Sequence, residues 1–312
     1  MNRITVIGSL NMDMVITAPR VPVLGETIMG SGFMTVPGGK GANQAAAASK
    51  LGGNVSLVGC VGDDLFGRSL LDNMKCFHVN VDYVRIVKGI STGIAAITIC
   101  NGNNFIVLDS GANEKLDRSM IDAAEEIIAG SCLLMIQMEI PQTVVEYAVE
   151  IAHRNNVKVL LNPAPACELP DELLSKVDIF TPNEAECEII TGIPVHSVED
   201  AMSAVRYLQK KGIQHVIITM GKNGAVYNNV EEIIHKSVPV VKAVDSTAAG
   251  DAFSGAVAVA LSEGKTIDDA VEFGNKAGTL TVLKKGAQAS LPSKRDIGAF
   301  DELVSKLSIV EE

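Results

Sequence analysis

A run of small residues that ends in an acid stands at residues 245–253, with the sequence DSTAAGDAF. An apolar segment of helical pattern, 252–261, follows it, and the N-terminus of a helix carries a positive partial charge that attracts phosphate. A carboxylate at that point, Asp251, could take the proton from a hydroxyl group as the hydroxyl attacks a bound phosphoryl group. Aspartate is also a favoured N-cap, so this segment alone leaves open a purely structural role for Asp251.

A second glycine-rich turn, PGGKGANQ at residues 37–44, runs into an alanine-rich helical segment, 42–50. Its glycines would let a polar ligand approach the backbone, while Lys40 and Asn43 would supply side-chain hydrogen bonds. The turn is not a Walker A motif, because Lys40 is followed by glycine rather than by serine or threonine. A plain strand-to-helix turn remains the alternative.

Three further polar residues stand beside expected strands. Asn11 and Asp13 alternate on an extended segment and therefore share one face, an arrangement that suits neighbouring hydroxyl groups of a sugar. Glu139 follows the apolar strand 133–137, at the carboxyl end where open α/β sheets bind ligands. For Asp13 taken singly, an ordinary surface position is the competing interpretation.

Two more turns follow expected strands in the second half of the chain. Asn183 and Glu186 open a helix and lie three residues apart, which is typical of a capping pair and equally of hard oxygen groups near phosphate and Mg²⁺. The glycine-rich turn 219–224 follows the strand 215–219 and could border a nucleotide.

The elements that must position these residues alternate after residue 112, which predicts a mainly parallel sheet with helices on both faces, a three-layer α/β sandwich. The expected helices are 117–129, 142–156, 184–191, 197–212, 252–263 and 267–284, and the expected strands are 132–137, 157–161, 177–181 and 215–219. The apolar segments 3–8 and 55–61 fit strands of the same sheet.

Two pairs of segments look like hairpin strands with no helix between them: 11–17 with 27–35, and 92–100 with 104–109. We interpret the stretches 11–35 and 91–110 as a small β-sheet outside the main one, here called the lid. Because the chain has no linker or repeat, we expect the lid to belong to a single domain, 1–312. An uncovered sheet would leave edges and apolar surface in water, so we also expect a homodimer formed through the lid.

The composition excludes several classes of protein. A hydrophobic content of 47 % with 20 % charged residues is that of a soluble globular protein, and no apolar run reaches membrane-spanning length. The net charge of −11 argues against a nucleic-acid partner. The cysteines and histidines lie scattered, without metal-ligand spacing. The amino terminus lacks the pattern of a secretory signal, so we expect a cytoplasmic protein.

Taken together, these segments resemble the ribokinase group of the PfkB-type carbohydrate kinases over nearly the whole chain. The segments that carry the resemblance are NMD at 11–13, GGKGANQA at 38–45, NPAPA at 162–166, TPNEAE at 181–186, DSTAAGDAF at 245–253 and KKGAQASLP at 284–292. The resemblance implies a ribokinase-like fold and the ATP-dependent phosphorylation of D-ribose on its 5-hydroxyl, with Asp251 as the catalytic base.

The resemblance also implies the ligand contacts. The sugar would meet Asn11, Asp13, Gly39, Lys40, Asn43, Glu139 and Asp251. ATP would lie along Asn183, Thr219, Gly221, Gly224, Gly250 and Asn275. An anion hole would come from the backbone of Ala248, Ala249, Gly250 and Asp251. Glu186 would act on Mg²⁺ through water, and an activating K⁺ would lie at Asp245, Thr247, Thr281, Lys284, Gly286 and Ser290.

Lys276 stands beside Asn275, where similar sequences often have a small residue, which puts the adenine side in question. A kinase of another sugar or of a nucleoside is the main alternative. A dehydrogenase is disfavoured, because the first strand leads into Gly8-Ser9-Leu10-Asn11 rather than into a glycine triplet. A sugar-binding protein without activity would have no need of Asp251.

Overall fold

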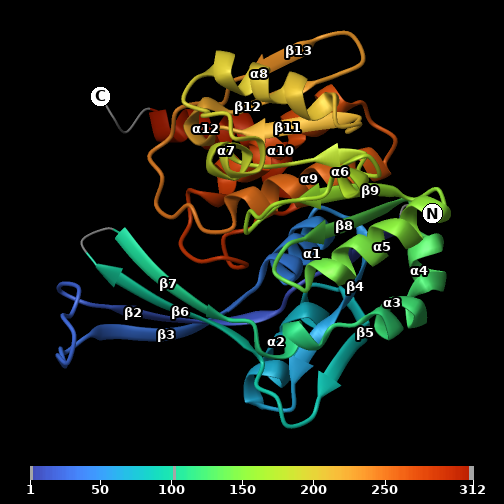
Figure 1. The fold of residues 1–312 in the computed structure, drawn as a ribbon. Coiled ribbons are helices and arrows are strands. Elements are labelled where there is room, and N and C mark those ends of the chain that lie inside the picture. Colours follow the sequence, from blue (N-terminus) through green and yellow to red (C-terminus); the bar gives the residue numbers. More distant parts are fainter. Residues whose placement is uncertain (1–2, 101–102, 309–312) are drawn as a thin grey trace.

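Strands from along the whole chain form the central sheet of the computed structural model, which describes residues 3–100 and 103–308 (Figure 1). The strand order is β13-β12-β11-β10-β9-β8-β1-β4-β5. All pairs from β5 to β11 are parallel, whereas β12 and β13 add an antiparallel edge. The strands are β1 (Arg3–Ile7), β4 (Asn54–Gly62), β5 (Asn80–Val87), β8 (Leu133–Gln137), β9 (Lys158–Asn162), β10 (Ile179–Phe180), β11 (His215–Thr219), β12 (Ala225–Asn228) and β13 (Ile233–Lys236).

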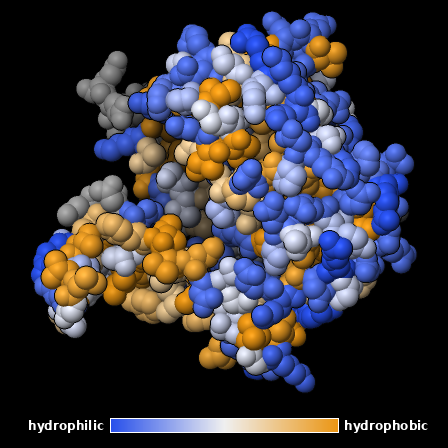
Figure 2. Space-filling model, in the orientation of Figure 1, coloured by the Kyte–Doolittle hydropathy of each residue, from blue (hydrophilic) through white to orange (hydrophobic). Residues whose placement is uncertain are grey.

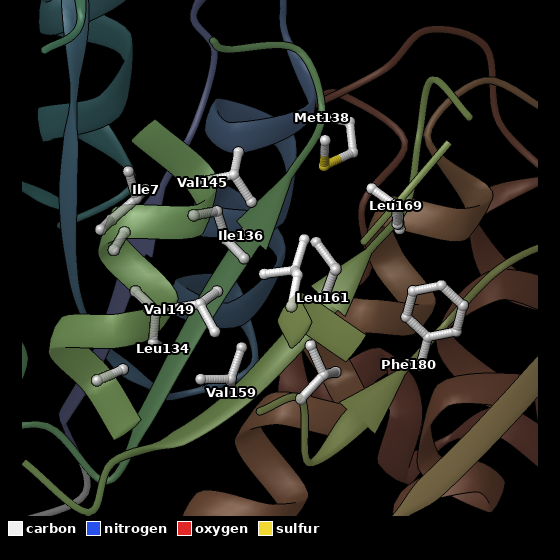
Figure 3. Close-up of a cluster of buried hydrophobic side chains, with 14 of the residues drawn as sticks. Ile7, Leu134, Ile136, Met138, Val145, Val149, Val159, Leu161, Leu169 and Phe180 are labelled. Atoms are coloured by element: carbon white, nitrogen blue, oxygen red, sulfur yellow. The ribbon is translucent and has the colours of Figure 1, made fainter. Parts of the chain in front are cut away.

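Helices cover both faces of this sheet because successive strand residues point to opposite sides. In β8, Leu134 and Ile136 pack with Val145 and Val149 of a covering helix (Figure 3), whereas Met135 belongs to the core on the other face. The first face carries α3 (Arg118–Ala123), α4 (Glu125–Ala129), α5 (Gln142–Arg154), α6 (Asp171–Leu174), α7 (Glu184–Thr191) and α8 (Val198–Gln209). The second carries α1 (Lys40–Lys50), α2 (Leu65–Cys76), α9 (Ala249–Ser262), α10 (Ile267–Thr281), α11 (Lys294–Gly298) and α12 (Phe300–Ser308). The three-layer α/β architecture is therefore confirmed.

The lid is a second sheet with the strand order β3-β2-β6-β7, which projects from the body of the molecule (Figure 1). Its strands are β2 (Asn11–Thr17), β3 (Ser31–Gly38), β6 (Gly93–Cys100) and β7 (Asn103–Asp109). The β2–β3 and β6–β7 pairs are antiparallel, and β2–β6 is parallel. The strand expected at 27–35 lies instead at 31–38, so it leads directly into the turn before α1. Residues 101–102, between β6 and β7, lie outside the described residues.

Two glycines let the start of α1 lie directly against the segment that follows β1. Gly39 has φ +89°, and a Cβ there would lie 2.6 Å from the Asn11 backbone nitrogen. A Cβ on Gly41 would lie 2.5 Å from the Gly8 carbonyl carbon. Any larger residue would push the two segments apart, so the glycines hold Lys40 and Asn43 beside Asn11.

Among the helices in the described part of the chain, none combines the length and the apolar character that crossing a membrane requires.

Candidate active site

The carboxyl ends of neighbouring parallel strands supply one side of a pocket of about 720 Å³. Asn162 ends β9, Asn183 follows β10, and Thr219 ends β11. Another part of the wall comes from the N-terminus of α9 and from α10, which contributes Asn275. Of the residues expected to contact ligands, the pocket wall includes Lys40, Asn183, Glu186, Thr219, Gly221, Gly224, Ala248, Ala249, Gly250, Asp251 and Asn275.

Asp251 lies in the first turn of α9, two residues after its start at Ala249. The N-cap is Ala248, in the left-handed conformation with φ +61°, so the interpretation of Asp251 as an N-cap is wrong. The side chain is 7 % exposed, and its two oxygens accept hydrogen bonds from different residues of α1. Asn43 Nδ2 donates to Oδ2 at 3.0 Å, and Gln44 Nε2 donates to Oδ1 at 3.0 Å.

The backbone at the start of α9 offers N–H groups to the pocket. The Ala249 N–H donates to the Ser246 carbonyl at 3.2 Å, so it takes part in the turn. The next two N–H groups, of Gly250 and Asp251, belong to the first turn, where a helix provides no carbonyl partner. A Cβ on Gly250 would meet open space, because this residue faces the pocket. The start of α9 thus has the donors and the dipole that an anion site needs.

Glu139 accepts hydrogen bonds from a second set of polar groups beside this pocket. Its Oε2 accepts from the Ser9 hydroxyl at 2.5 Å, from the Lys40 backbone N–H at 3.1 Å and from Asn11 Nδ2 at 3.4 Å. Asn113 Nδ2 donates to Asn11 Oδ1 at 2.8 Å, which fixes the orientation of the Asn11 amide. Ser9, Asn11, Asn113, Glu139 and the Lys40 backbone N–H are thus joined by hydrogen bonds, and we call this group the sugar-side cluster.

Asp13 joins this cluster from the lid. Burial, with further contributions from the charges of Glu139 and Asp251, raises the pKa of Asp13 to about 7. Within the described chain no protein group donates a hydrogen bond to its carboxylate, and Gly38 lies so close that a Cβ there would be 2.4 Å from Asp13 Oδ2. An ionised Asp13 therefore calls for donors from a ligand, such as hydroxyl groups.

Lys40 connects the sugar-side cluster with the pocket. Burial alone would lower its pKa, but the charges of Asp251, Glu139 and Glu186 outweigh that effect and raise the pKa. The protonated ammonium group thus lies among these carboxylates and lines the pocket. Its position places a positive charge between the two halves of the site.

The Asn183–Glu186 pair proves to be a capping box at the start of α7. Glu186 N–H donates to Asn183 Oδ1 at 2.9 Å, and Asn183 N–H donates to Glu186 Oε2 at 2.9 Å. Both residues also line the pocket, so the capping role does not replace a role toward phosphate and Mg²⁺. Burial is the chief cause that raises the pKa of Glu186.

One group of pocket-lining residues is apolar and was not predicted from the sequence. Val238, Pro239, Val241 and Ala243 come from the loop between β13 and α9, and Val282 follows α10. Such a wall suits a flat aromatic base. Lys276 forms an ion pair with Glu272 at 3.1 Å and is not among the described residues that line this pocket. The adenine side stays a prediction.

The loops expected to hold K⁺ meet at Asp245. Its carboxylate accepts from Thr247 Oγ1 at 2.7 Å and from the Gly286 N–H at 2.9 Å. Burial opposes ionisation, but these hydrogen bonds prevail and the pKa of Asp245 is lowered. The hydroxyls of Thr281 and Ser290 donate to the carbonyls of Ala277 and Ala287 instead. The Thr281 carbonyl also accepts from the Lys284 N–H, and the K⁺ ligand set stays a prediction.

Five buried polar residues around the site were given no role in the sequence analysis: Ser9, Gln44, Asn113, Asn162 and Gln288. The available signal was strongest for Gln44, because an amide within the alanine-rich segment of α1 has to find a polar partner when that helix is buried. One buried oxygen, Gln137 Oε1, has no hydrogen-bond partner among the described residues. Such a group costs about 1–3 kcal/mol.

Comparisons with known proteins agree with this geometry. A model of the pfkB family of carbohydrate kinases matches residues 1–294. The chain belongs to this family. Among similar pfkB kinases, the ribokinase of Haemophilus influenzae is 42 % identical over 301 residues, which cover 96 % of this chain and 98 % of that protein. A deoxyribokinase of Salmonella typhi is 37 % identical over 304 residues, covering 97 % and 98 %.

A solved structure of the Arabidopsis thaliana ribokinase, complexed with ribose and ATP, is also similar to this pfkB kinase. It has a TM-score of 0.91 and 34 % sequence identity, and the match covers 96 % of this chain and 99 % of that one. The resemblance seen in the sequence and the ribokinase-like fold are therefore confirmed.

Gly250 allows a test of the anion site in this pfkB kinase. Gly250→Ala should leave stability unchanged or raise it by up to about 1 kcal/mol, because alanine favours the helix and its Cβ meets open space. Its kcat should fall at least about 10-fold, because the methyl group intrudes beside the N–H donors. Thermal unfolding and steady-state rates measure both effects. Gly298→Ala, equally open but outside the pocket, is the control, and equal rates for the two variants would contradict the assignment.

Proposed function

We propose that this protein transfers the terminal phosphoryl group of ATP to the 5-hydroxyl of D-ribose, with Asp251 as the general base. One observation carries the proposal. Asp251 accepts a hydrogen bond from Asn43, beside the sugar-side cluster. The same carboxylate lines the pocket at the N-terminus of α9. A hydroxyl group held by the cluster and a phosphoryl group held by the helix would thus meet at one carboxylate.

In the proposed reaction each group has one task. The carboxylates of Asp13 and Glu139 and the amides of Asn11 and Asn43 would bind the sugar hydroxyls. Asp251 would accept the proton as the 5-oxygen attacks the terminal phosphorus of ATP and ADP leaves. The N–H groups of Gly250 and Asp251 would stabilise charge on the phosphoryl oxygens, and the adjacent Lys40 would add its positive charge.

The residues present fit a magnesium ion carried by the nucleotide. Within the described residues no group of three His, Cys, Asp or Glu side chains could hold a metal ion. Phosphate oxygens and water would supply most of its ligands. Glu186 would reach the ion through water, because its capping bond engages Oε2 and Oε1 can still accept. When bound, Mg²⁺ would neutralise phosphate charge.

We also propose that K⁺ binds at Asp245 and the carbonyl groups of the adjoining loops, next to the turn that carries the anion site. Occupation would stabilise the turn before α9, so rates at fixed Mg²⁺ should be severalfold higher in K⁺ than in tetramethylammonium at equal ionic strength. Initial-rate assays in the two salts measure this difference, and Asp245→Ala should remove it. Identical rates of the wild-type protein in both salts would eliminate the K⁺ site.

The homodimer is proposed to form through the lid. Met34, Val15, Ile97 and Ile106 make one cross-strand row, and Met34 and Ile106 are 50 % and 55 % exposed. Figure 2 shows hydrophobic side chains over the projecting lid. We expect a dimer in sedimentation velocity, and Ile106→Asp should shift it to monomer because a charge would be buried. A wild-type monomer at all concentrations would refute the arrangement.

The expected cytoplasmic location also stays a prediction.

A panel of acceptors tests the proposed substrate. ADP release should be far faster with D-ribose than with adenosine, because the sugar-side cluster offers polar groups for hydroxyls and none of its residues is aromatic. 2-Deoxyribose belongs in the panel because a deoxyribokinase is among the relatives. Faster turnover of adenosine would favour a nucleoside kinase, and a preference for 2-deoxyribose would change the substrate while leaving the chemistry intact.

A further inference from the structure

Two chains of buried side-chain amides end on the carboxylate of Asp251. On one side Gln137 Nε2 donates to Gln44 Oε1 at 2.7 Å, and Gln44 Nε2 donates to Asp251 Oδ1 at 3.0 Å. On the other side Gln288 Nε2 donates to Asn43 Oδ1 at 3.0 Å, and Asn43 Nδ2 donates to Asp251 Oδ2 at 3.0 Å. Every link directs its N–H group toward the carboxylate.

The orientation of the Gln44 amide is fixed by its neighbours. Asn162 Nδ2 donates to the Thr181 carbonyl at 2.8 Å, and a carbonyl can only accept. Asn162 must therefore present its oxygen to Gln44, whose Nε2 donates to it at 3.1 Å. With an acceptor at both Asn162 and Asp251, the Gln44 amide has to point its nitrogen toward them and its oxygen toward Gln137.

This orientation has an unfavourable consequence at the start of the chain of amides. Gln137 has to donate to Gln44, so its own Oε1 remains buried without a partner among the described residues. An apolar side chain at this place would leave no such oxygen. Buried amides that leave one oxygen without a hydrogen bond are typical of a site where donors are needed at a defined position.

We propose that Gln44 is a positioning residue for Asp251 in the phosphoryl transfer, an inference that rests on the proposed function. Gln44 is fully buried, so it cannot touch a substrate and acts only through the carboxylate. Its N–H holds Oδ1 from one side while Asn43 holds Oδ2 from the other. The carboxylate plane is thereby kept between the sugar-side cluster and the start of α9, with lone pairs left for the attacking hydroxyl.

Gln44→Met tests this role, because methionine has a similar volume and donates no hydrogen bond. We expect kcat for ribose phosphorylation to fall about 10-fold or more, with the KM values of ribose and ATP within about twofold of the wild type. In the Asp251→Ala background the same substitution should leave the residual rate unchanged, since the group it positions is gone. An equal loss in both backgrounds would overturn the proposal. A wild-type protein that does not phosphorylate ribose would instead refute the proposed function.

Two further variants separate positioning from general stability. Asn228→Leu removes another buried amide, one that bonds the Gln214 carbonyl and the Val216 N–H far along the sheet, and it should lower stability while kcat stays near the wild-type value. Gln44→Glu can donate only when protonated. Its kcat at pH 6 relative to pH 8 should therefore exceed the wild-type ratio, even if Gln44→Met fails to fold. An unchanged ratio would contradict the role assigned to the Gln44 N–H group.

Discussion

Replacement of Asp251 by alanine should lower kcat by about 10²–10⁴-fold, the usual contribution of a general base, while KM for ATP changes only slightly. The carboxylate accepts a hydrogen bond from Asn43, beside the sugar-side cluster, and lines the pocket. Its loss should therefore remove the proton acceptor and leave the nucleotide contacts in place. Steady-state rates and nucleotide binding by calorimetry check the two parts. A folded variant whose kcat lies within threefold of the wild type would exclude Asp251 as the base.

The choice of alanine follows from the hydrogen bonds of Asp251. Both oxygens accept hydrogen bonds from amide N–H groups. An asparagine would therefore place its own amide N–H against the N–H of Asn43 or of Gln44. Asp251→Asn should therefore lose about 1–3 kcal/mol of stability in addition to activity. The alanine variant opens space toward the pocket, where water can satisfy the two donors. A comparison of thermal unfolding for both variants separates stability from chemistry.

Asp13→Asn should weaken ribose binding and at the same time stabilise the protein without ligand above neutral pH. Ionised Asp13 would accept hydrogen bonds from sugar hydroxyls, and each bond to a charged group contributes about 1.5–3 kcal/mol, so KM for ribose should rise about 10²-fold. Without sugar the charge lies near Glu139 and Asp251 and is poorly solvated. Asparagine removes that unfavourable charge.

The sign of the pH effect follows from the raised pKa of Asp13. Its value rises from 3.8 to about 7 on folding, so the carboxyl group contributes stability below pH 3.8 that is lost as the pH rises to about 7. At pH 8 the variant should therefore be more stable than the wild type by up to about 4 kcal/mol, and near pH 4 the gain should vanish. Denaturant unfolding at both pH values measures this difference. A variant that is less stable at pH 8 would disprove the raised pKa.

The fold was largely predictable because buried parallel strands and amphipathic helices leave clear periods in the sequence. The helix 184–191 and the strand 215–219 were placed with their observed bounds. The helix expected from 252 starts at Ala249, since the small residues before Asp251 carry no apolar period. The expected helix 117–129 divides at Ala124, and β5, with its half-exposed pattern, received no assignment.

The chemistry of single segments was also predictable, but the way they combine was not. The glycine turns and polar residues at strand ends indicated where ligands would bind. Asp251 and Gln44 are 207 positions apart in the sequence, and nothing local indicates that one donates to the other. Aspartate is a favoured cap residue, and nothing in the sequence indicates the left-handed conformation of Ala248, which is the actual N-cap of α9.

The position of the phosphate on the product tests the account most directly, because the arrangement around Asp251 is proposed to activate one hydroxyl group. After incubation with ATP, Mg²⁺ and D-ribose, the proton-coupled phosphorus NMR spectrum should show a new triplet, since a phosphate on the 5-carbon couples to two protons. The triplet should be absent with Asp251→Ala over the same time. A doublet from a phosphate on the anomeric carbon, or inorganic phosphate as the only product, would contradict the account.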